Sequence, residues 1–415
     1  MYKQILKEII VKNQKRIQEL TVHERDYAFE KKANYVIVGS RRAGKTYLLF
    51  QIIKEIIKKG KTEEILYINF EDERLIGLNH NSLHQILDSY SELFEHKPQL
   101  FFDEIQNIKH WEKFARRLAD EGYEIHITGS NSEMLSTQIA STLGGRFIVK
   151  EVLPLSFPEF LSFNDLKLEK NYLYSSQNKL IKKQFESYFK YGGFPELYKF
   201  DDKRTYLSNL FQKLLYGDII ARYKVKNDKA LLLLTKKIAE SVNNETSINR
   251  IKNLIKSIGI PIGTNTAFEY LNYLHESYMV FPVTNFVNKF VEKESKKKYY
   301  FVDNGILMLF LHNQDTKLLE NLVFIELKRR YQEIYYYKRN YETDFYIPEK
   351  DLLIQVSYDI SDIETEKREL KSLKKSIEEL GCKNAKIITY DTDKEMELNG
   401  NKIEVISAWK WLLGN

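Results

Sequence analysis

Eight consecutive residues carry the clearest chemistry in the sequence. They are Gly39, Ser40, Arg41, Arg42, Ala43, Gly44, Lys45 and Thr46, a full match to the pattern G-x-x-x-x-G-K-[ST]. In such a loop the backbone N–H groups and the N-terminus of the following helix bind phosphate. Lys45 would reach the β- and γ-phosphates, and the Thr46 hydroxyl would hold Mg²⁺. The loop therefore predicts a site for ATP and Mg²⁺; the alternative is a glycine turn that precedes a helix by chance.

Two adjacent carboxylates, Asp103 and Glu104, follow the apolar run that begins at Gln99. After a phosphate-binding loop, the first carboxylate of such a pair orders Mg²⁺ and its water, and the second polarises the attacking water. We therefore predict that Asp103 is a metal ligand and that Glu104 is the general base. A Glu directly after the Asp indicates an ATPase whose base lies on this strand, rather than a GTPase that uses a Gln elsewhere.

Three further positions are candidates for contacts to the γ-phosphate or to the attacking water. Ser130 or Asn131 follows a predicted strand and could act as a sensor, or equally as a helix N-cap. Arg146 could be an arginine finger, in cis or across a subunit contact, or a surface arginine in a salt bridge. Within the loop, the two arginines at 41 and 42 could pair with phosphate or with the acidic residues 71–73.

The elements that must position these residues alternate between short β-rich runs and helical runs, from Tyr35 to about Leu155. Strands are predicted at 34–38, 65–70, 99–102, 124–128 and 147–152, with helices such as 45–59 and 111–121 between them. This alternation predicts a parallel sheet covered by helices. The phosphate-binding loop would then follow the first strand and open a helix, which is the context that its chemistry requires.

The whole chain reads as a multidomain α/β protein. We expect an ATPase core at 1–155, a helical, lid-like region at 156–229, a winged helix at 230–303 and a second α/β domain at 304–415. The winged-helix prediction rests on helices at 248–258 and 266–277, followed by a β-hairpin at 278–287 and 299–302. In the last region, helices at 319–332 and 364–380 lie among predicted strands.

Several strings of the sequence resemble one family, in order along the chain. They are GSRRAGKT, INFEDERL, FFDEIQ, HITGSNSEML, GGRF, PLSFPEF and YGGFPE, and the likeness continues to the terminal AWKWLL. The chain resembles archaeal and bacterial P-loop ATPases with an AAA-like core (AAA_14 type) and a C-terminal domain of uncharacterised, nuclease-like type (DUF4143 type). This resemblance implies an ASCE or AAA-like core, a small helical region, a winged helix and a restriction-endonuclease-like domain similar to PD-(D/E)XK nucleases.

The nuclease pattern implies four positions in the C-terminal domain. Glu320 would lie on the first helix and Asp344 at a strand start, but Gln355 replaces the metal-binding Glu and Ser357 replaces the Lys. A neutral amide binds Mg²⁺ far more weakly than a carboxylate, and Ser cannot supply the lost cation. We therefore expect an inactive nuclease fold. The alternative is that Glu320 and Asp344 serve ordinary caps and salt bridges.

The predicted winged helix gives conflicting signals for DNA binding. Its second helix, at 266–276, contains two Glu and no Lys or Arg, whereas helices that read the major groove present basic or amide side chains. The hairpin tip contains Lys289, Lys293 and Lys296–Lys298 beside Tyr299, which could contact phosphates or form a solvated tip.

The composition excludes several classes of protein. The chain has 415 residues, of which 43% are hydrophobic, so it can fill the cores of roughly two to four domains. The single cysteine, Cys382, excludes an intrachain disulfide and a multi-cysteine zinc site. No apolar run reaches the length of a membrane span, so we expect a cytoplasmic protein. The net charge of +6 permits a polyanionic partner without requiring one.

Together these features predict a Mg²⁺-dependent ATPase that acts as a switch or motor. ATP and ADP are the expected ligands, with DNA or a protein as a further partner, and a homo-oligomer would follow if Arg146 acts in trans. One alternative is a nucleotide-gated scaffold for protein or nucleic acid that turns ATP over slowly. The other is an ATP-dependent DNA nuclease, against which Gln355 and Ser357 argue.

Overall fold

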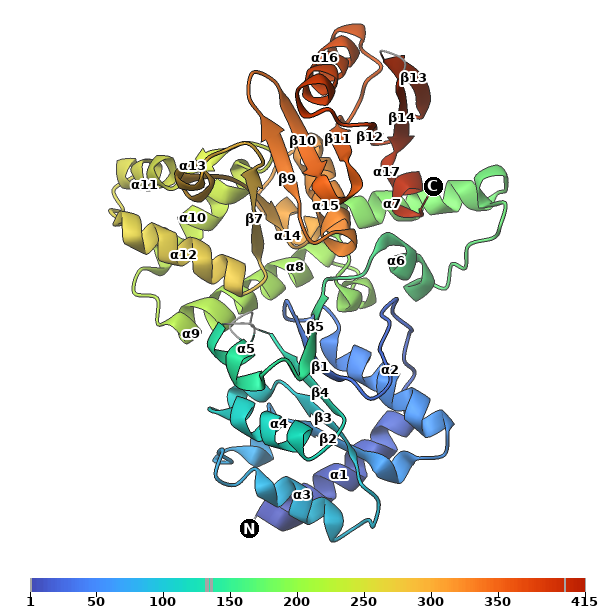
Figure 1. Ribbon diagram of the computed structural model, residues 1–415, viewed down its shortest axis with the longest axis vertical. Coiled ribbons are helices and arrows are strands. Elements are labelled where there is room, and N and C mark those ends of the chain that lie inside the picture. Colours follow the sequence, from blue (N-terminus) through green and yellow to red (C-terminus); the bar gives the residue numbers. More distant parts are fainter. Residues whose placement is uncertain (1, 131–133, 135–136, 399–400, 415) are drawn as a thin grey trace. The chain divides into compact units, whose positions relative to one another are not determined.

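The computed structural model describes residues 2–130, 134, 137–398 and 401–414. The chain packs into two units, Met1–Leu153 and Pro154–Asn415, whose elements are labelled in Figure 1. Within the described residues, no helix is both long enough and apolar enough to cross a bilayer.

The first unit contains a five-stranded parallel sheet with the strand order β2-β3-β4-β1-β5. The strands are β1 (Asn34–Gly39), β2 (Ile65–Asn69), β3 (Gln99–Asp103), β4 (Ile125–Gly129) and β5 (Phe147–Val152). Each begins and ends within one residue of its predicted bounds, which confirms the predicted parallel α/β sheet. Because β4 lies between β1 and β3, the carboxyl ends of β1, β4 and β3 are neighbours at one edge of the sheet.

Helices α1 and α2 cover one face of this sheet. The helices of the unit are α1 (Tyr2–Glu19), α2 (Lys45–Lys58), α3 (His84–Ser91), α4 (Trp111–Asp120) and α5 (Thr137–Leu143). In α2 the side chains of Leu48, Leu49 and Ile53 are fully buried and pack with Tyr35 of β1 and Tyr67 of β2. This apolar stripe fixes the position of α2 and therefore of the loop at its N-terminus.

The second unit begins with a helical region. Its helices are α6 (Phe157–Phe163), α7 (Gln177–Tyr191), α8 (Lys203–Gln212), a π-helical segment (Lys213–Ile220), α9 (Ala221–Tyr223) and α10 (Asp228–Glu240). Two of the family-like strings meet here, because the Leu155 N–H donates to the carbonyl of Gly193 at 2.7 Å. The same turn is held by Asp303, which accepts from the N–H groups of Gly193 (2.7 Å) and Gly305 (2.8 Å).

A nine-stranded sheet forms the rest of the second unit, with the order β13-β14-β12-β11-β10-β9-β7-β8-β6. The strands are β6 (Thr246–Ser247), β7 (Val280–Asn285), β8 (Lys296–Phe301), β9 (Tyr335–Lys338), β10 (Glu342–Ile347), β11 (Leu352–Val356), β12 (Asn384–Thr389), β13 (Lys394–Leu398) and β14 (Asn401–Ser407). β7 pairs in parallel with β9, through Thr284 with Tyr335 and Asn285 with Tyr336. The boundary expected between residues 303 and 304 therefore lies within one continuous sheet.

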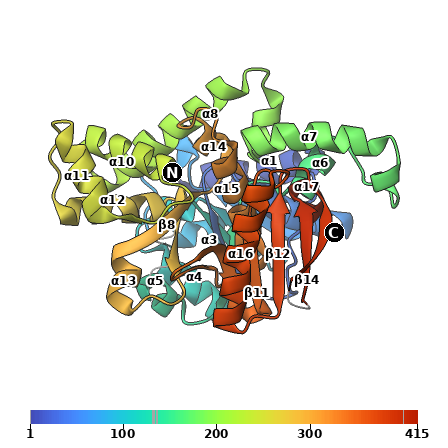
Figure 2. The ribbon, with the colours of Figure 1, turned by 90° about the horizontal axis from the view of Figure 1, so that it is seen from above.

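Helices accompany both parts of this sheet. They are α11 (Ile248–Ser257), α12 (Thr264–Glu276), α13 (Phe290–Ser295), α14 (Asn304–Met308), α15 (Asp315–Arg330), α16 (Ile363–Leu380) and α17 (Ala408–Leu412). α16 packs against β10 and β11 and buries Leu373 against Tyr337, Leu353 and Ile387. Figure 2 shows α16 beside β11. α13, β13 and the first residues of β8 were not predicted from the sequence.

Candidate nucleotide-binding site

The loop at residues 39–46 leads from β1 into α2, and two glycines make its path possible. Gly39 has a φ of 146°, and a Cβ there would lie 2.1 Å from the carbonyl oxygen of Val152. Gly44 has a φ of 100° and is the N-cap of α2, in the left-handed region that glycine adopts without strain. The loop therefore leads into the N-terminus of α2, and the first N–H groups of a helix, together with its dipole, favour an anion.

Lys45 is buried and points back across this loop. Its ammonium donates to the carbonyls of Gly39 and Ser40, at 3.1 Å each, and lies 3.8 Å from Glu104 Oε1. The ammonium therefore lies against the backbone of the phosphate-binding loop. A phosphate oxygen could take the place of either carbonyl as acceptor.

Asp103 lies at the carboxyl end of β3 and accepts hydrogen bonds from three hydroxyl groups. Thr46 Oγ1 and Tyr67 Oη each donate to Asp103 Oδ2 at 2.8 Å, and Thr128 Oγ1 donates to Asp103 Oδ1. Burial, and next the charge of Glu104, raises the pKa of Asp103, while the three hydroxyl donors oppose this shift. The two predicted metal ligands, Thr46 and Asp103, are therefore in direct contact.

Glu104 follows Asp103 with its backbone in the left-handed region, at a φ of 52°. Few residues other than glycine adopt this conformation, and such outliers are concentrated at functional sites. Its N–H donates to Thr128 Oγ1 at 3.0 Å, and Gln106 Nε2 donates to its carboxylate. Burial alone would raise the pKa of Glu104, but the charge of Lys45 and the Gln106 hydrogen bond outweigh it and lower the pKa. Glu104 is therefore ionised at neutral pH.

Of the two predicted sensor residues, Ser130 lies within the described part of the chain. Ser130 is buried at the end of β4, and Gln106 Nε2 lies 3.4 Å from its hydroxyl oxygen, so Ser130 belongs to the group around Glu104. Asn131 lies outside the described residues. Arg41 pairs with Glu71 at 2.7 Å, which is one of the two pairings that the sequence suggests.

Arg146 lies at the opposite edge of the sheet from the phosphate-binding loop of its own chain. Its backbone carbonyl accepts a hydrogen bond from Asn34 Nδ2, at the amino end of β1, and its guanidinium pairs with Asp120 at the end of α4. The six residues of β1 separate this edge from Gly39 by roughly 17 Å, at about 3.3 Å per residue. Within its own chain Arg146 therefore lies away from the phosphate-binding loop, in a salt bridge of the kind that the sequence suggested as the alternative.

The residues present fit a bound nucleotide. Ser40 is 1% exposed, and its Oγ is a buried polar atom without a hydrogen-bond partner in the described structure. Buried polar groups are normally paired, so an unpaired hydroxyl inside the loop matches a missing phosphate acceptor. Thr46 and Asp103 supply the oxygen ligands that Mg²⁺ prefers.

The fold and this geometry define a P-loop nucleotide-binding domain. Residues 31–161 match the AAA domain family. Uncharacterized protein MJ1544 of Methanocaldococcus jannaschii is 37% identical over 428 residues, covering 99% of this chain and 95% of its own length. An uncharacterized protein of Haemophilus influenzae is 30% identical over 390 residues, covering 91% and 94%. The chain belongs to the family of these archaeal and bacterial proteins.

Residues 182–317 match a domain of unknown function, DUF8612. The suggested DUF4143 type for the C-terminal domain is not supported by this match. Among solved structures, the chain is similar to the Walker-type ATPase PABY2304 of Pyrococcus abyssi, with 16% identity, a TM-score of 0.38 and coverage of 71% of this chain and 99% of that one. The Orc1 protein of Aeropyrum pernix in complex with DNA gives 12% identity, a TM-score of 0.31 and coverage of 78% and 93%.

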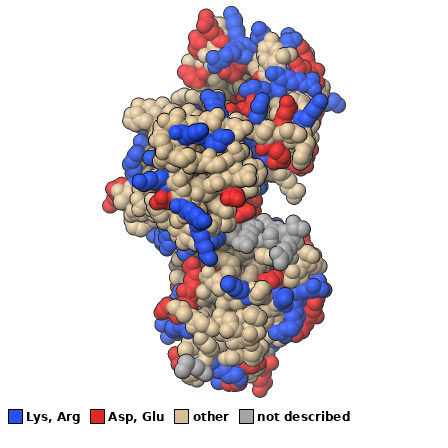
Figure 3. Space-filling model, turned by 90° about the vertical axis from the view of Figure 1, so that its left-hand side faces the viewer, with Lys and Arg blue, Asp and Glu red and all other residues tan. Residues whose placement is uncertain are grey.

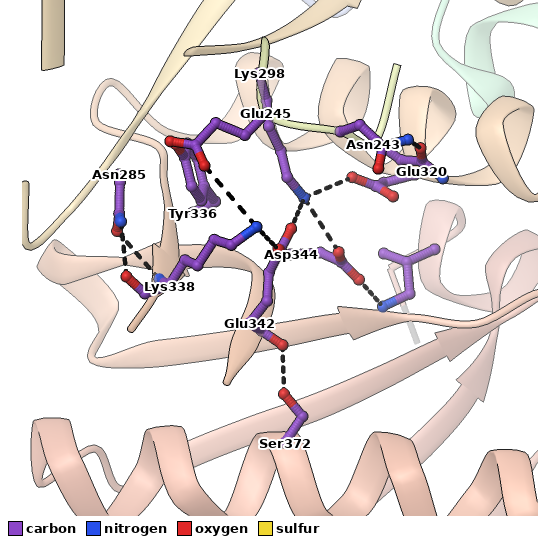
Figure 4. A network of polar contacts seen from close by, with 12 residues as sticks. Asn243, Glu245, Asn285, Lys298, Glu320, Tyr336, Lys338, Glu342, Asp344 and Ser372 are labelled. Carbon is purple, nitrogen blue, oxygen red and sulfur yellow. Dashed lines mark hydrogen bonds and ion pairs between the residues drawn. The ribbon is translucent and has the colours of Figure 1, made fainter. Parts of the chain in front are cut away.

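Two of the four positions of the nuclease pattern contact a common group in the second unit, and the other two have different hydrogen-bond partners. Glu320 on α15 and Asp344 on β10 face one another across the ammonium of Lys298 (Figure 4). Gln355 instead donates to Glu369 of α16 at 2.7 Å, and Ser357 donates to the carbonyl of Asp359. The Gln355 and Ser357 side chains thus form their hydrogen bonds with residues outside the nuclease pattern.

Sequence reasoning missed several residues of these two sites. Tyr67, Thr128 and Gln106 orient the carboxylates of the first site, and their types carry no signal until the strand order brings them together. Lys298 was interpreted as part of a basic hairpin tip, but it is 0% exposed. Lys298 lies two residues before Tyr300 on β8, so the two side chains lie on the same face of the sheet. This spacing was the signal that could have revealed its burial.

Proposed function

We propose that this protein binds ATP with Mg²⁺ at residues 39–46 and hydrolyses it, as a molecular switch or motor. The observation that carries this proposal is the convergence of two pairs at one edge of the sheet. Thr46 lies 2.8 Å from Asp103, and Lys45 lies 3.8 Å from Glu104. Thr46 and Asp103 supply oxygen ligands for the metal, and Lys45 places a cation beside the base, Glu104. Phosphoryl transfer needs both of these functions.

The residues of the site have separate roles in this proposal. Lys45 exchanges its loop carbonyls for phosphate oxygens, and Thr46 and Asp103 hold the metal. Mg²⁺, when bound, supplies positive charge that offsets the charge of the phosphates. Glu104, which is ionised at neutral pH, accepts the proton of the attacking water, and Ser130 and Gln106 keep its carboxylate in place.

The test is the rate of ATP hydrolysis by the Glu104→Gln variant. General-base assistance is typically worth about 10²–10⁴-fold, so we expect turnover to fall by this factor while ATP affinity is retained. Glu73→Gln is a matched control, because Glu73 is an exposed carboxylate after β2. Equal turnover in wild type and Glu104→Gln would show that the water is activated elsewhere. Each rate is measured with and without DNA.

A nucleotide-gated scaffold with slow turnover is the second candidate. It is favoured by the position of Arg146, which is held by Asp120 at the far edge of the sheet and so adds no charge to its own site. Rapid hydrolysis would then require an arginine from another subunit, and thus a homo-oligomer. Tight ATP binding with turnover that stays slow at every protein concentration would support the scaffold over the motor.

We further propose that residues 228–301 form a winged-helix-like module that docks a partner. The order α10, β6, α11, α12, β7 and β8 supports it, since β6 pairs with β8 and β7 with β8 as in a three-stranded wing. The support for DNA as partner is small. Lys298 is buried, Lys297 pairs with Glu294 at 3.0 Å, and on the face shown in Figure 3 Lys and Arg are interspersed with Asp and Glu.

A further inference from the structure

A buried lysine lies at the centre of an acidic cluster in the second unit. Lys298, on β8, is 0% exposed. Its Nζ lies 2.9 Å from Glu342 Oε1, 3.3 Å from Glu320 Oε1 and 3.4 Å from Asp344 Oδ1. Figure 4 shows the three carboxylates converging on this one nitrogen, from α15 and β10. Carboxylate oxygens are also the ligands that hard cations take in proteins.

Each carboxylate of the cluster is also held by a second partner. Tyr300 Oη donates to Glu320 Oε1 at 2.7 Å, and the Val356 N–H donates to Asp344 Oδ2 at 2.9 Å. Glu342 pairs through its other oxygen with Lys338 at 2.7 Å. The carboxylates are therefore fixed by the fold independently of Lys298, which only fills the space between them.

Burial decides between two roles for this lysine. A catalytic lysine must reach a substrate, yet Glu320 and Asp344 are 3% and 8% exposed and Lys298 is covered completely. Charges buried as deeply as those of Lys298, Glu320 and Asp344 are retained only when they are paired. The ammonium pairs with both of these carboxylates and with Glu342, whose side chain is 32% exposed. The ring of Tyr336, 5.4 Å from Nζ, closes another side of the pocket.

We infer that Lys298 is a built-in cation that takes the place of a divalent metal ion among Glu320, Glu342 and Asp344. The ammonium of Lys298 thus offsets part of the negative charge of the cluster, and Lys338 offsets a further part at Glu342. Among the described residues, no group of three or more His, Cys, Asp or Glu side chains is arranged to hold a metal ion. The same contacts tie β8, from the winged-helix-like module, to α15 and β10.

The inference predicts that removal of the lysine side chain creates a metal site. Without the ammonium, modest inward movement of the carboxylates would bring their oxygens to the roughly 2.0–2.6 Å from a cation at which hard divalent cations are bound. We expect Lys298→Ala to melt at a lower temperature than wild type without metal, and to gain one Mn²⁺ per chain and recover part of its melting temperature with Mn²⁺. Binding is counted by electron paramagnetic resonance in the absence of nucleotide, so that any Mn²⁺ at the phosphate-binding loop is common to all samples.

Two controls isolate the cluster. Lys297→Ala removes the neighbouring lysine, which pairs with Glu294 and not with the cluster, and should gain no site. Lys298→Ala combined with Asp344→Ala should lose the gained Mn²⁺. A folded Lys298→Ala protein that binds no more Mn²⁺ than wild type would overturn the inference.

A second measurement does not depend on the folding of the lysine variant. Wild type and Asp344→Asn should bind the same number of Mn²⁺ ions, because the lysine already excludes metal from the cluster. If wild type binds one more Mn²⁺ than Asp344→Asn, the metal coexists with Lys298 and the inference is wrong. Lys298→Met, which keeps the length of the apolar stem, replaces Lys298→Ala if the latter does not fold.

Discussion

Asp103 and Glu104 are neighbours in sequence, yet the structure gives them different electrostatic environments. Asp103 faces three hydroxyl groups, and burial raises its pKa, whereas the charge of Lys45 outweighs burial at Glu104 and lowers the pKa there. Adjacent carboxylates whose pKa values are pushed apart take different roles in a site. The hydroxyl-lined carboxylate suits metal binding, and the one beside the cation suits proton transfer.

The first prediction at this scale concerns Lys45. We expect Lys45→Ala to abolish measurable ATP binding, with affinity lowered by at least about 10–100-fold, because a charge-assisted hydrogen bond to phosphate is worth roughly 1.5–3 kcal/mol. Titration calorimetry with ATP and Mg²⁺ measures it. Lys58→Ala, at the exposed end of the same helix, is the control. Near-wild-type affinity in Lys45→Ala would mean that the nucleotide binds elsewhere.

At the scale of elements, the strands of the first unit could be predicted because each is a short apolar run bounded by turn residues. β8 could not. Its first three residues are lysines, and such a run is typical of a solvated tip. The burial of Lys298 depends on Glu320 and Asp344, which are 22 and 46 residues away in sequence. Local pattern carries no information about partners at that separation.

The turn that joins α7, α14 and the segment after β5 gives a prediction of pH dependence. Burial raises the pKa of Asp303 from its ordinary 3.8 to about 6, although the N–H groups of Gly193 and Gly305 oppose the shift. The folded state therefore binds this proton more tightly than the unfolded state. The stabilisation is fully present below about pH 4 and is lost as the pH rises through 6.

We expect Asp303→Asn to flatten this dependence, because the amide does not ionise. The two pKa values differ by about two, which corresponds to about 3 kcal/mol at most. Urea unfolding between pH 4 and 7 measures the free energy of unfolding for wild type and variant. Asp201→Asn, an exposed carboxylate in the same unit, serves as the control. An unchanged slope in Asp303→Asn would show that another group is responsible.

At the scale of the whole molecule, Arg146 bears on assembly. If it acts as a finger in trans, turnover per chain should rise with protein concentration. Mixing Arg146→Ala with Glu104→Gln should then restore part of the activity, because one mixed interface contains both an intact arginine and an intact base. ATPase assays of each variant alone provide the baseline. Constant turnover on dilution, with no rescue on mixing, would exclude the trans role.

The second unit leads to a prediction about DNA. We expect no metal-dependent cleavage with Mg²⁺ or Mn²⁺, with or without ATP, because Lys298 fills the acidic cluster and Gln355 and Ser357 contact other residues. Nicking of supercoiled plasmid is the assay. A contaminant can mimic cleavage, so wild type is compared with Asp344→Ala. Nicking that disappears in the variant would restore the nuclease hypothesis.

The sequence by itself determined the strands of the first unit and the candidate residues of its first site. The loop at 39–46, its strand and helix, and the two carboxylates at 103 and 104 are all specified by local pattern, because each motif lies within a few residues of the element that presents it. Only the tertiary structure decided the remaining features. They are the far edge on which Arg146 lies, the single sheet that spans residues 303 and 304, and the burial of Lys298. Each depends on strand pairing between distant segments, and pairing decides whether a charged side chain meets water or another charge.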